Sequence, residues 1–349
     1  MDPAGSSKPV GDAAPLQSRR TFLRYAAAVG ILGPAAVGRG ARPAAADEPP
    51  GDEPVPAATK AAHLAAGLVA LSRVHPQGWV GGHFGAAVVA SHYFCEDNDL
   101  DGRTARALRA NVDAFLAHRP DQFPKAGPGA GTADPVRIVE RLDRQVHELR
   151  SGGHDKIFAA LALRALKDLP EYATPAVVDG ICRLLEVFAA TARPVTASRY
   201  ALEHPTEPYR GPADLAAATL RAMLRPWGHV RQVGTSGVLH WVTHAEALLT
   251  LEDLGYGEVA RKGYAAHQLV HNRPVVDDGS RPPERPPVDW LGPAYWESDT
   301  PRRALDGSWL FGHSFKLPYS LFTLLRRVDD EALRSASLTR AALLSVPFE

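Results

Sequence analysis

The sequence has few of the features that define a specialised class of protein. It contains only two cysteines, Cys95 and Cys182, among 349 residues, which is too few for a disulfide-dense scaffold and too few to bind zinc without other ligands. Basic and acidic side chains balance at 39 each, so net charge favours neither nucleic acid nor an anionic membrane surface as a partner. We expect the two cysteines to be structural, either bridged or buried.

Several catalytic and structural signatures are also absent. The sequence has no glycine loop of the kind that binds phosphates, no G-x-S-x-G elbow and no stripe of alternating basic and aromatic residues. No run of alternating apolar and polar residues is long enough to predict a sheet, and no internal stretch has the composition of a long linker. These absences favour a single all-α domain.

The first 46 residues have the pattern of an export signal. Ser18–Arg24 reads SRRTFLR, a mild apolar run follows from Ala26 to Val37, and Ala44–Ala46 offers a small-residue cleavage site. This leader resembles that of twin-arginine substrates, which implies the twin-arginine export machinery as a partner and a periplasmic or extracellular location. The apolar run is too short for a membrane span. We predict a signal peptide over 1–46, a flexible tether over 47–57 and one domain over 58–349.

Apolar periodicity predicts helices in consecutive sets of three. In each set the middle helix is apolar nearly all round, which indicates burial, and the flanking helices have one apolar face. The fourth set lacks a clear first helix and has a long segment rich in proline and tryptophan in its place, from 272 to 309. The predicted helices are 58–74, 83–94 and 104–118; 135–150, 154–169 and 175–192; 212–224, 238–254 and 256–271; and, in the fourth set, 312–328 and 329–344.

The buried middle helices have a shared feature at their starts. Each begins next to a glycine and a histidine, at His83, His154, His240 and His313. Closing four such units into a ring would bring these starts around one cavity. The pattern resembles the α/α toroids of terpene cyclases, lanthionine cyclases and several carbohydrate-active enzymes in architecture only, because the catalytic motifs of the first two are not found. An open α-solenoid is the alternative fold.

Histidines at these starts indicate a metal site. Imidazole and carboxylate groups bind zinc, iron or manganese, and the one-turn spacing of His240 and His244 lets two side chains hold one ion. Trp241 stands where the protease motif H-E-x-x-H has glutamate, so that motif is excluded. The alternative is that the histidines only bond carbonyls at helix starts. The metal ligands predicted from the sequence are His83, His154, His240 and His244.

Acid and base chemistry without a metal is a second hypothesis. Asp155, Lys316 and His313 are the predicted catalytic residues, because a carboxylate beside apolar sequence can have a raised pKa and a lysine in an apolar run can bind an anion. For Asp155 the alternative is that it only interacts with the positive end of its helix.

The segment between the third and fourth sets predicts a binding loop. Flat aromatic rings interleaved with carboxylates suit a saccharide or another ring-bearing ligand. The alternative is that the tryptophans fill the space of the missing helix. The predicted substrate-binding residues are Trp290, Tyr295, Trp296, Glu297 and Trp309.

Residues 97–102 copy the first half of a calcium loop, as DNDLDG. Leu108 stands where such a loop needs glutamate, so the sequence disfavours calcium and favours a turn in which Asp101 or a neighbour caps the next helix. The combined expectation is an exported toroid enzyme, a hydrolase or lyase, that acts on a polar small molecule or saccharide with a metal. A metal-free carbohydrate lyase or hydrolase and a non-catalytic helical scaffold are the alternatives.

Overall fold

The computed structural model describes residues 57–123, 127, 129–197, 203, 206–225, 238–271, 288–298 and 312–345. These residues are mostly helical, which confirms the predicted all-α class. The predicted leader over 1–46 and almost all of the predicted tether lie outside the described residues. The structure therefore tests the predictions for the helical domain over 58–349 and leaves those for the leader as predictions.

Four buried helices lie next to one another inside this body. They are α3 (Gly82–Asp97), α6 (His154–Asp168), α11 (Val238–Asp253) and α15 (His313–Leu325), and nearly all their side chains are removed from solvent. Helix α3 contacts α6, α6 contacts α11, α11 contacts α15, and α15 contacts α3 again. These are the helices whose sequences are apolar on all sides, and such helices need neighbours around them. The toroid itself remains a prediction.

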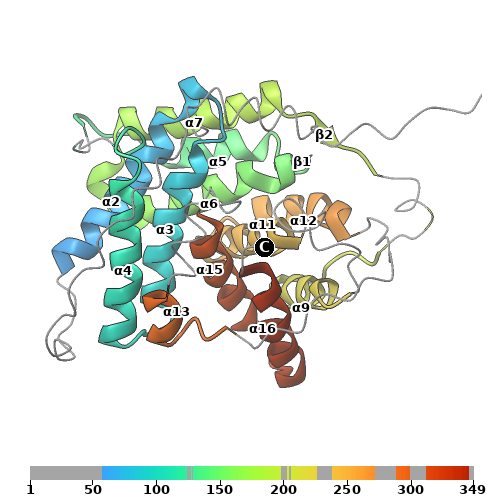
Figure 1. The fold of residues 1–349 in the computed structure, drawn as a ribbon. Helices are drawn as coiled ribbons and strands as arrows, with labels where there is room; N and C mark the ends of the chain where they lie inside the picture. Colours follow the sequence, from blue (N-terminus) through green and yellow to red (C-terminus); the bar gives the residue numbers. More distant parts are fainter. Residues whose placement is uncertain are drawn as a thin grey trace, which may run out of the picture. The chain divides into compact units, whose positions relative to one another are not determined.

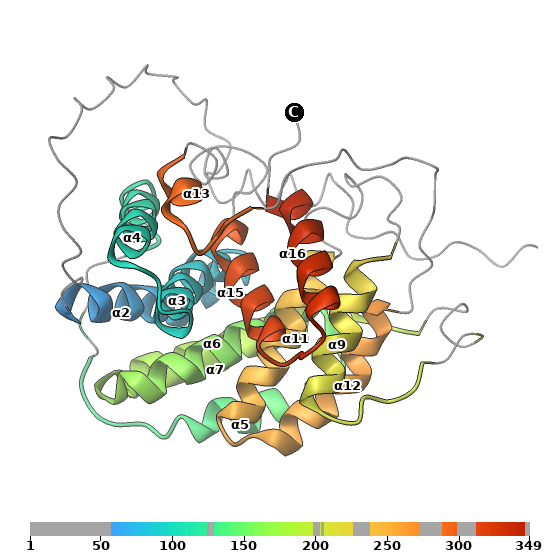
Figure 2. The same ribbon diagram turned by 90° about the horizontal axis from the view of Figure 1, so that it is seen from below.

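Amphipathic helices pack around the inner four (Figures 1 and 2). Helix α2 packs on α3, α6 and α7; α12 and α9 pack on α11; and α16 packs on α9. In Figure 2, α9 and α12 lie together on one side of α11, while α4 lies beside α3 at the other end of the view. The outer helices are α2 (Ala57–Arg73), α4 (Gly102–Ala117), α5 (Val136–Asp143), α7 (Pro175–Thr191), α9 (Pro212–Met223), α12 (Gly257–His271) and α16 (Glu331–Ser345).

The predicted helix over 135–150 is too long. Helix α5 ends at Asp143, and the chain then enters the two-residue strand β1 (Leu149–Arg150), which pairs antiparallel with β2 (Pro194–Val195). The apolar residues Val146 and Leu149 are buried, but in turn and strand geometry. Short helical pieces complete the described chain: η1 (His75–Gln77), η2 (Ser151–Gly153), η3 (Pro170–Tyr172) and α13 (Pro293–Glu297).

Two sequence expectations about single residues are settled by this fold. Asp101 caps α4, since its carboxylate accepts a hydrogen bond from the Thr104 backbone N–H at 2.7 Å. Cys95 is a buried free thiol, as expected, whereas Cys182 is a half-buried free thiol, so the expectation that it is bridged or buried is wrong. Among the described helices, none combines the length and the apolar character that a bilayer crossing requires.

Candidate metal centre

The four inner helices bring four histidines together at their starts. One ring nitrogen from each of His83, His154, His240 and His313 lies within 4.8 Å of those of the other three. His83 is in the first turn of α3, His154 and His313 begin α6 and α15, and His240 is in the first turn of α11. All four side chains are buried, with exposed fractions between 3% and 7%. Residues separated by large distances along the chain thus form one cluster, which we call the four-histidine centre.

Glycines allow the helix starts to approach one another so closely. Gly153 caps α6 with a φ of +91°, a conformation that residues with a side chain rarely adopt. A Cβ atom at Gly153 would lie 2.6 Å from Cγ of His244, and one at Gly152 would lie 3.2 Å from Cγ of His240. The Gly-Gly-His sequence is therefore needed for α6 to begin against the first turns of α11.

Backbone carbonyls orient two of the imidazoles. Nδ1 of His83 lies 2.7 Å from the Val80 carbonyl oxygen, and Nδ1 of His154 bonds the Ser151 carbonyl oxygen. A carbonyl oxygen can only accept, so in both rings Nδ1 carries the proton. Nε2 of His83 and of His154 is therefore the unprotonated ring nitrogen, which is the tautomer found in histidines that bind metals through Nε2.

His154 and His240 lie within hydrogen-bonding distance of each other. Their Nε2 atoms lie 3.1 Å apart. Two ligands of one tetrahedral zinc ion, each about 2.0–2.1 Å from the metal, would be separated by roughly 3.3 Å. The observed distance is therefore close to that of two ligands of one ion, although a hydrogen bond from His240 Nε2–H to His154 Nε2 also accounts for it.

Burial keeps the imidazoles in the form that binds metals. It holds the pKa of His83, His154 and His313 well below the ordinary value, and the neighbouring histidines and Lys316 lower each pKa further. A neutral imidazole is a metal ligand, whereas a protonated one is not. The lowered pKa values consequently favour neutral nitrogen donors at these three positions.

A buried lysine, Lys316, lies within electrostatic reach of this centre. It lies one helical turn after His313 on α15 and is 3% exposed. Burial holds the pKa of Lys316 well below its ordinary value, and no ion pair to it is found among the described residues. The sequence prediction placed Lys316 and His313 in one site, and the structure brings both to the four-histidine centre.

His244, a predicted ligand, is not part of the four-histidine centre. Its ring is fully buried and lies 5.2 Å from the ring of His267, which in turn contacts the Trp241 carbonyl oxygen at 3.0 Å. His240 and His244 share one face of α11, but four residues of helix correspond to about 6 Å along the axis. His244 consequently lies one turn deeper than the cluster, and His313 is the fourth histidine instead.

Asp155 is also outside the four-histidine centre. Its Oδ2 accepts a hydrogen bond from Lys156 Nζ at 2.8 Å, and both side chains have no exposed area. Burial raises the pKa of Asp155, and the neighbouring Lys156 opposes that rise. Successive helical residues point about 100° apart, so Asp155 does not share the direction of His154. The carboxylate of Asp155 is one half of a buried ion pair, and its catalytic role stays a prediction.

The predicted substrate-binding residues lie in and around α13. Trp290 and Trp296 are each 1% exposed, and the Trp296 indole stacks on Phe315 with ring centroids 6.2 Å apart. Tyr295 is 8% exposed, and Glu297 forms a bidentate ion pair with Arg103 at 2.7 and 2.8 Å. This packing favours the alternative in which the aromatic rings fill space in the fold. Trp309 lies outside the described residues.

An aromatic wall beside the centre was not predicted. The Trp79 ring lies 5.1 Å from that of His154 and 5.8 Å from that of His83, and it also contacts Phe188 at 5.2 Å between centroids. Phe158 packs edge-on against His83 and His154, both at 5.5 Å. The proximity of Trp79 to Gly81, Gly82 and His83 in the sequence is the signal that could have identified it.

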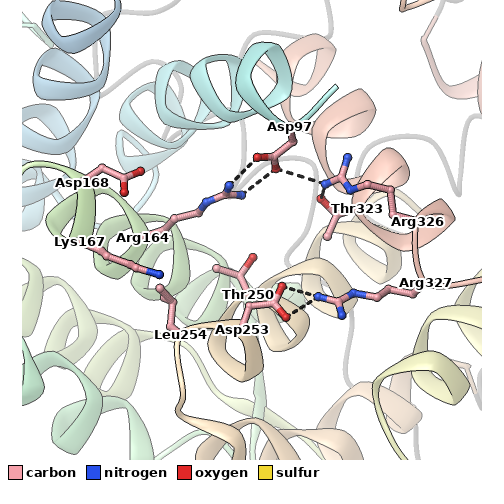
Figure 3. A pocket seen from close by; sticks show the side chains of 10 residues that line it. All are labelled: Asp97, Arg164, Lys167, Asp168, Thr250, Asp253, Leu254, Thr323, Arg326 and Arg327. Carbon is pink, nitrogen blue, oxygen red and sulfur yellow. Dashed lines mark hydrogen bonds and ion pairs between the residues drawn. The ribbon is translucent and has the colours of Figure 1, made fainter. Parts of the chain in front are cut away.

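A pocket of about 480 Å³ lies at the opposite ends of the same four helices (Figure 3). Arg164 forms a bidentate ion pair with Asp97 at 2.6 and 2.9 Å, Arg326 contacts Asp97 at 3.2 Å, and Arg327 pairs with Asp253. The four inner helices therefore run in the same direction, because their N-terminal ends meet at the four-histidine centre and their C-terminal ends meet at this pocket. The pocket is lined by Asp97, Arg164, Lys167, Asp168, Thr250, Asp253, Leu254, Thr323, Arg326 and Arg327.

Polar side chains continue from this pocket into the interior. The Thr250 hydroxyl donates to Glu246 Oε1 at 2.6 Å and lies 3.4 Å from the Tyr319 hydroxyl, which accepts a hydrogen bond from Arg164 at 3.1 Å. Burial raises the pKa of Glu246 to about 7. On α15, Lys316, Tyr319 and Thr323 follow His313 at helical spacing. The sequence of α15 therefore contains polar residues on one helix face, although most of its other residues are apolar.

Comparison with known proteins gives no relative from which a function can be transferred. No protein-family model, no curated protein and no solved structure matches this chain significantly. The geometry of the four-histidine centre is therefore the main basis for assigning a function.

Proposed function

We propose that this protein is an exported metalloenzyme that acts on a polar small molecule or saccharide, with a divalent transition metal held by the four-histidine centre. One observation carries the proposal: nitrogen atoms of His83, His154, His240 and His313, from four separate helices, lie within 4.8 Å of one another. A lone buried histidine usually has a structural role, whereas four imidazoles whose ring nitrogens lie this close together can serve as the donor set of a metal site.

The donor set favours some metals over others. Zinc, iron and manganese were all compatible with the mixed imidazole and carboxylate ligands expected from the sequence. The four residues of the centre are all imidazoles, and imidazole suits zinc and iron, whereas carboxylate and carbonyl oxygens suit manganese. We therefore propose zinc or iron, which would act as a Lewis acid toward a bound substrate.

The side chains around the four-histidine centre support a catalytic role for it. Trp79 and Phe158 exclude water on one side of the imidazoles. Lys316 adds a buried amine within electrostatic reach of three of the histidines. Polar groups in a largely dry site interact more strongly than they would in water, which is the condition that catalysis by positioned groups requires.

A second candidate is a metal-free cluster that stabilises the helix starts. The 3.1 Å contact between Nε2 of His154 and Nε2 of His240 favours it, because a hydrogen bond between two neutral imidazoles has that length. In that case the protein is a helical scaffold, or an enzyme that uses the histidines as acids and bases.

Metal analysis distinguishes the two candidates. The full chain would be expressed with its own leader in a bacterium that has the twin-arginine pathway, purified without chelators or affinity metals, and analysed by inductively coupled plasma mass spectrometry. We expect about one equivalent of zinc or iron per chain. Less than about a tenth of an equivalent of any transition metal, in protein that also fails to bind added zinc, would eliminate the proposal in favour of the metal-free cluster.

A further inference from the structure

The pocket at the C-terminal ends of the four inner helices is a second candidate binding site, separate from the four-histidine centre. Its volume of about 480 Å³ is in the range of sites that bind small molecules. Nine of its ten described lining residues carry a charged group or a hydroxyl group, and Leu254 is the tenth. Such a lining favours a ligand that is polar over most of its surface.

Arg164 is held in one orientation inside this pocket (Figure 3). Its guanidinium group makes the bidentate ion pair with Asp97 and donates a hydrogen bond to the Tyr319 hydroxyl at 3.1 Å. It also stacks on the Tyr93 ring, with Cζ 3.7 Å from the ring centroid. A side chain with this many contacts loses little further freedom when a ligand binds, so the pocket is preorganised.

Thr250 presents a hydrogen-bond acceptor in the same pocket. Its hydroxyl donates to Glu246 Oε1 at 2.6 Å, so its proton is engaged while its oxygen can still accept a hydrogen bond from a ligand. Glu246 is buried below it, which protects this hydrogen bond from water and fixes the direction of the hydroxyl. Thr250 is therefore suited to a ligand that donates, such as one with a hydroxyl group.

The three arginines of the pocket wall are already paired with aspartates. Arg164 and Arg326 contact Asp97, and Arg327 contacts Asp253. A charged ligand would have to displace one member of such a pair to form its own ion pair. A hydroxyl group can donate to the carboxylate and accept from the guanidinium group while the pair stays in place. The pairing therefore favours a ligand with uncharged hydroxyl groups.

The pocket as a whole carries little net charge. Its lining has four cationic side chains and three aspartates. The C-terminal ends of α3, α6, α11 and α15 meet there, and each such end carries a partial negative charge that offsets the excess of positive charge. The electrostatics of the pocket therefore agree with the pairing of its arginines in favouring a neutral ligand.

We propose that this pocket binds a neutral polyhydroxylated ligand, such as a saccharide unit, whose hydroxyl groups bridge the arginine–aspartate pairs and donate to Thr250. The inference concerns a different site from the four-histidine centre and does not depend on a metal there. Inner helices of 13 to 16 residues separate the two sites. That length corresponds to about 20 Å, so one saccharide unit cannot contact both sites.

The first test measures sugar binding to the full mature chain by saturation-transfer difference NMR. Glucose, galactose and mannose would be the neutral probes. Each would be compared with its 2-amino and 6-phosphate derivatives, which add one positive or one negative group to the same ring. We expect at least one neutral sugar to bind saturably and more tightly than both of its charged derivatives. This comparison uses the natural sequence, so it does not depend on whether any variant folds.

Asp253→Ala then tests where the sugar binds, with Asp143→Ala as the matched control. Both are partly exposed aspartates that pair with a basic side chain, Arg327 and Lys262 respectively, but Asp253 lines the pocket and Asp143 does not. We expect Asp253→Ala to weaken sugar binding by about tenfold or more, because a hydrogen bond to a charged group is lost. Asp143→Ala should bind the sugar as the natural chain does.

Several outcomes would overturn the inference. The pocket is not a saccharide site if none of the three neutral sugars binds with a dissociation constant below about 10 mM. Tighter binding of a charged derivative contradicts the choice of a neutral ligand. Equal affinity of Asp253→Ala and the natural chain places the sugar elsewhere.

Removal of metal separates this site from the four-histidine centre. Sugar binding at the pocket should be the same before and after treatment of the protein with EDTA, because no step of the inference uses a metal ion. Loss of sugar binding after EDTA would place the sugar at the four-histidine centre and contradict the pocket as its site. A chain that holds no metal but binds a neutral sugar would contradict the proposed metalloenzyme and leave this inference supported.

Discussion

Nε2 of His154 and Nε2 of His240 lie 3.1 Å apart, although the two residues are separated by 86 positions in the chain. Each sits in the first turn of a buried helix, and Gly152 and Gly153 let those two turns meet. His83 and His313 complete the group from the other two inner helices. A site assembled from four helix starts depends on the whole fold, and it can be tested one helix at a time.

The first prediction distinguishes two histidines of the same helix. His240→Ala should lower the metal content by at least about tenfold, because it removes one of four ligands, while His244→Ala should leave about one equivalent bound. Both side chains are buried, so both variants lose stability and stability alone does not separate them. Metal content of the folded fraction is the measurement, and equal loss of metal in both variants would place His244 in the centre after all.

The second prediction concerns the glycine that caps α6. Gly153→Ala and Gly255→Ala both put a side chain at a positive φ, +91° and +90° respectively, which costs about 1–2 kcal/mol of unfolding free energy. Only at Gly153 does the new methyl group meet another residue, His244, at 2.6 Å, whereas nothing lies within 4 Å at Gly255. We therefore expect Gly153→Ala to cost a further 1–3 kcal/mol or so by urea denaturation. Equal losses for the two variants would show that the approach of α11 to α6 is looser than described.

The third prediction is a pH dependence from Glu246. Burial raises its pKa from 4.5 to about 7, so above pH 4.5 the unfolded state loses this proton while the folded state retains it. The unfolding free energy should therefore fall by up to about 3 kcal/mol as the pH rises from 4.5 to 7, relative to Glu246→Gln, which stays neutral. Stability of both proteins would be measured by urea denaturation across this range.

Comparison with Glu246→Gln is needed because the buried histidines have the opposite effect. Their lowered pKa values make the unfolded state bind more protons below pH 6.5, so they raise stability as the pH increases. The substitution of an exposed carboxylate, Glu171→Gln, serves as the control. A constant difference between the natural chain and Glu246→Gln would show that Glu246 ionises normally.

The fourth prediction concerns what holds α13 in place. Asn111 is fully buried, and its Nδ2 donates to the Trp296 carbonyl oxygen at 2.6 Å. Asn111→Ala should cost about 1–3 kcal/mol of unfolding free energy, because it leaves that buried carbonyl without its donor. Arg103→Ala, which removes the exposed ion pair to Glu297, should cost no more than about 1 kcal/mol. A larger loss for Arg103→Ala than for Asn111→Ala would mean that the surface pair anchors this segment.

The sequence by itself determined the helices and the residues at their starts. Apolar residues at helical spacing identified α3, α6, α11 and α15 as buried, and the predicted starts of all four lie within one residue of the observed ones. Helix periodicity depends only on local geometry, so a sequence can show it. Helix geometry alone could also have excluded Asp155 from the site of His154, because adjacent residues of a helix point in different directions.

Only the tertiary structure decided which side chains meet. His240 and His244 share one face of α11, and periodicity cannot say which of two turns lies level with the starts of α3, α6 and α15. That depends on how far each helix is displaced along its axis, which the packing of Gly153 against α11 fixes. The burial of Trp290 and Trp296 was equally undecided, because an aromatic ring suits a core and a binding site alike until its neighbours are known.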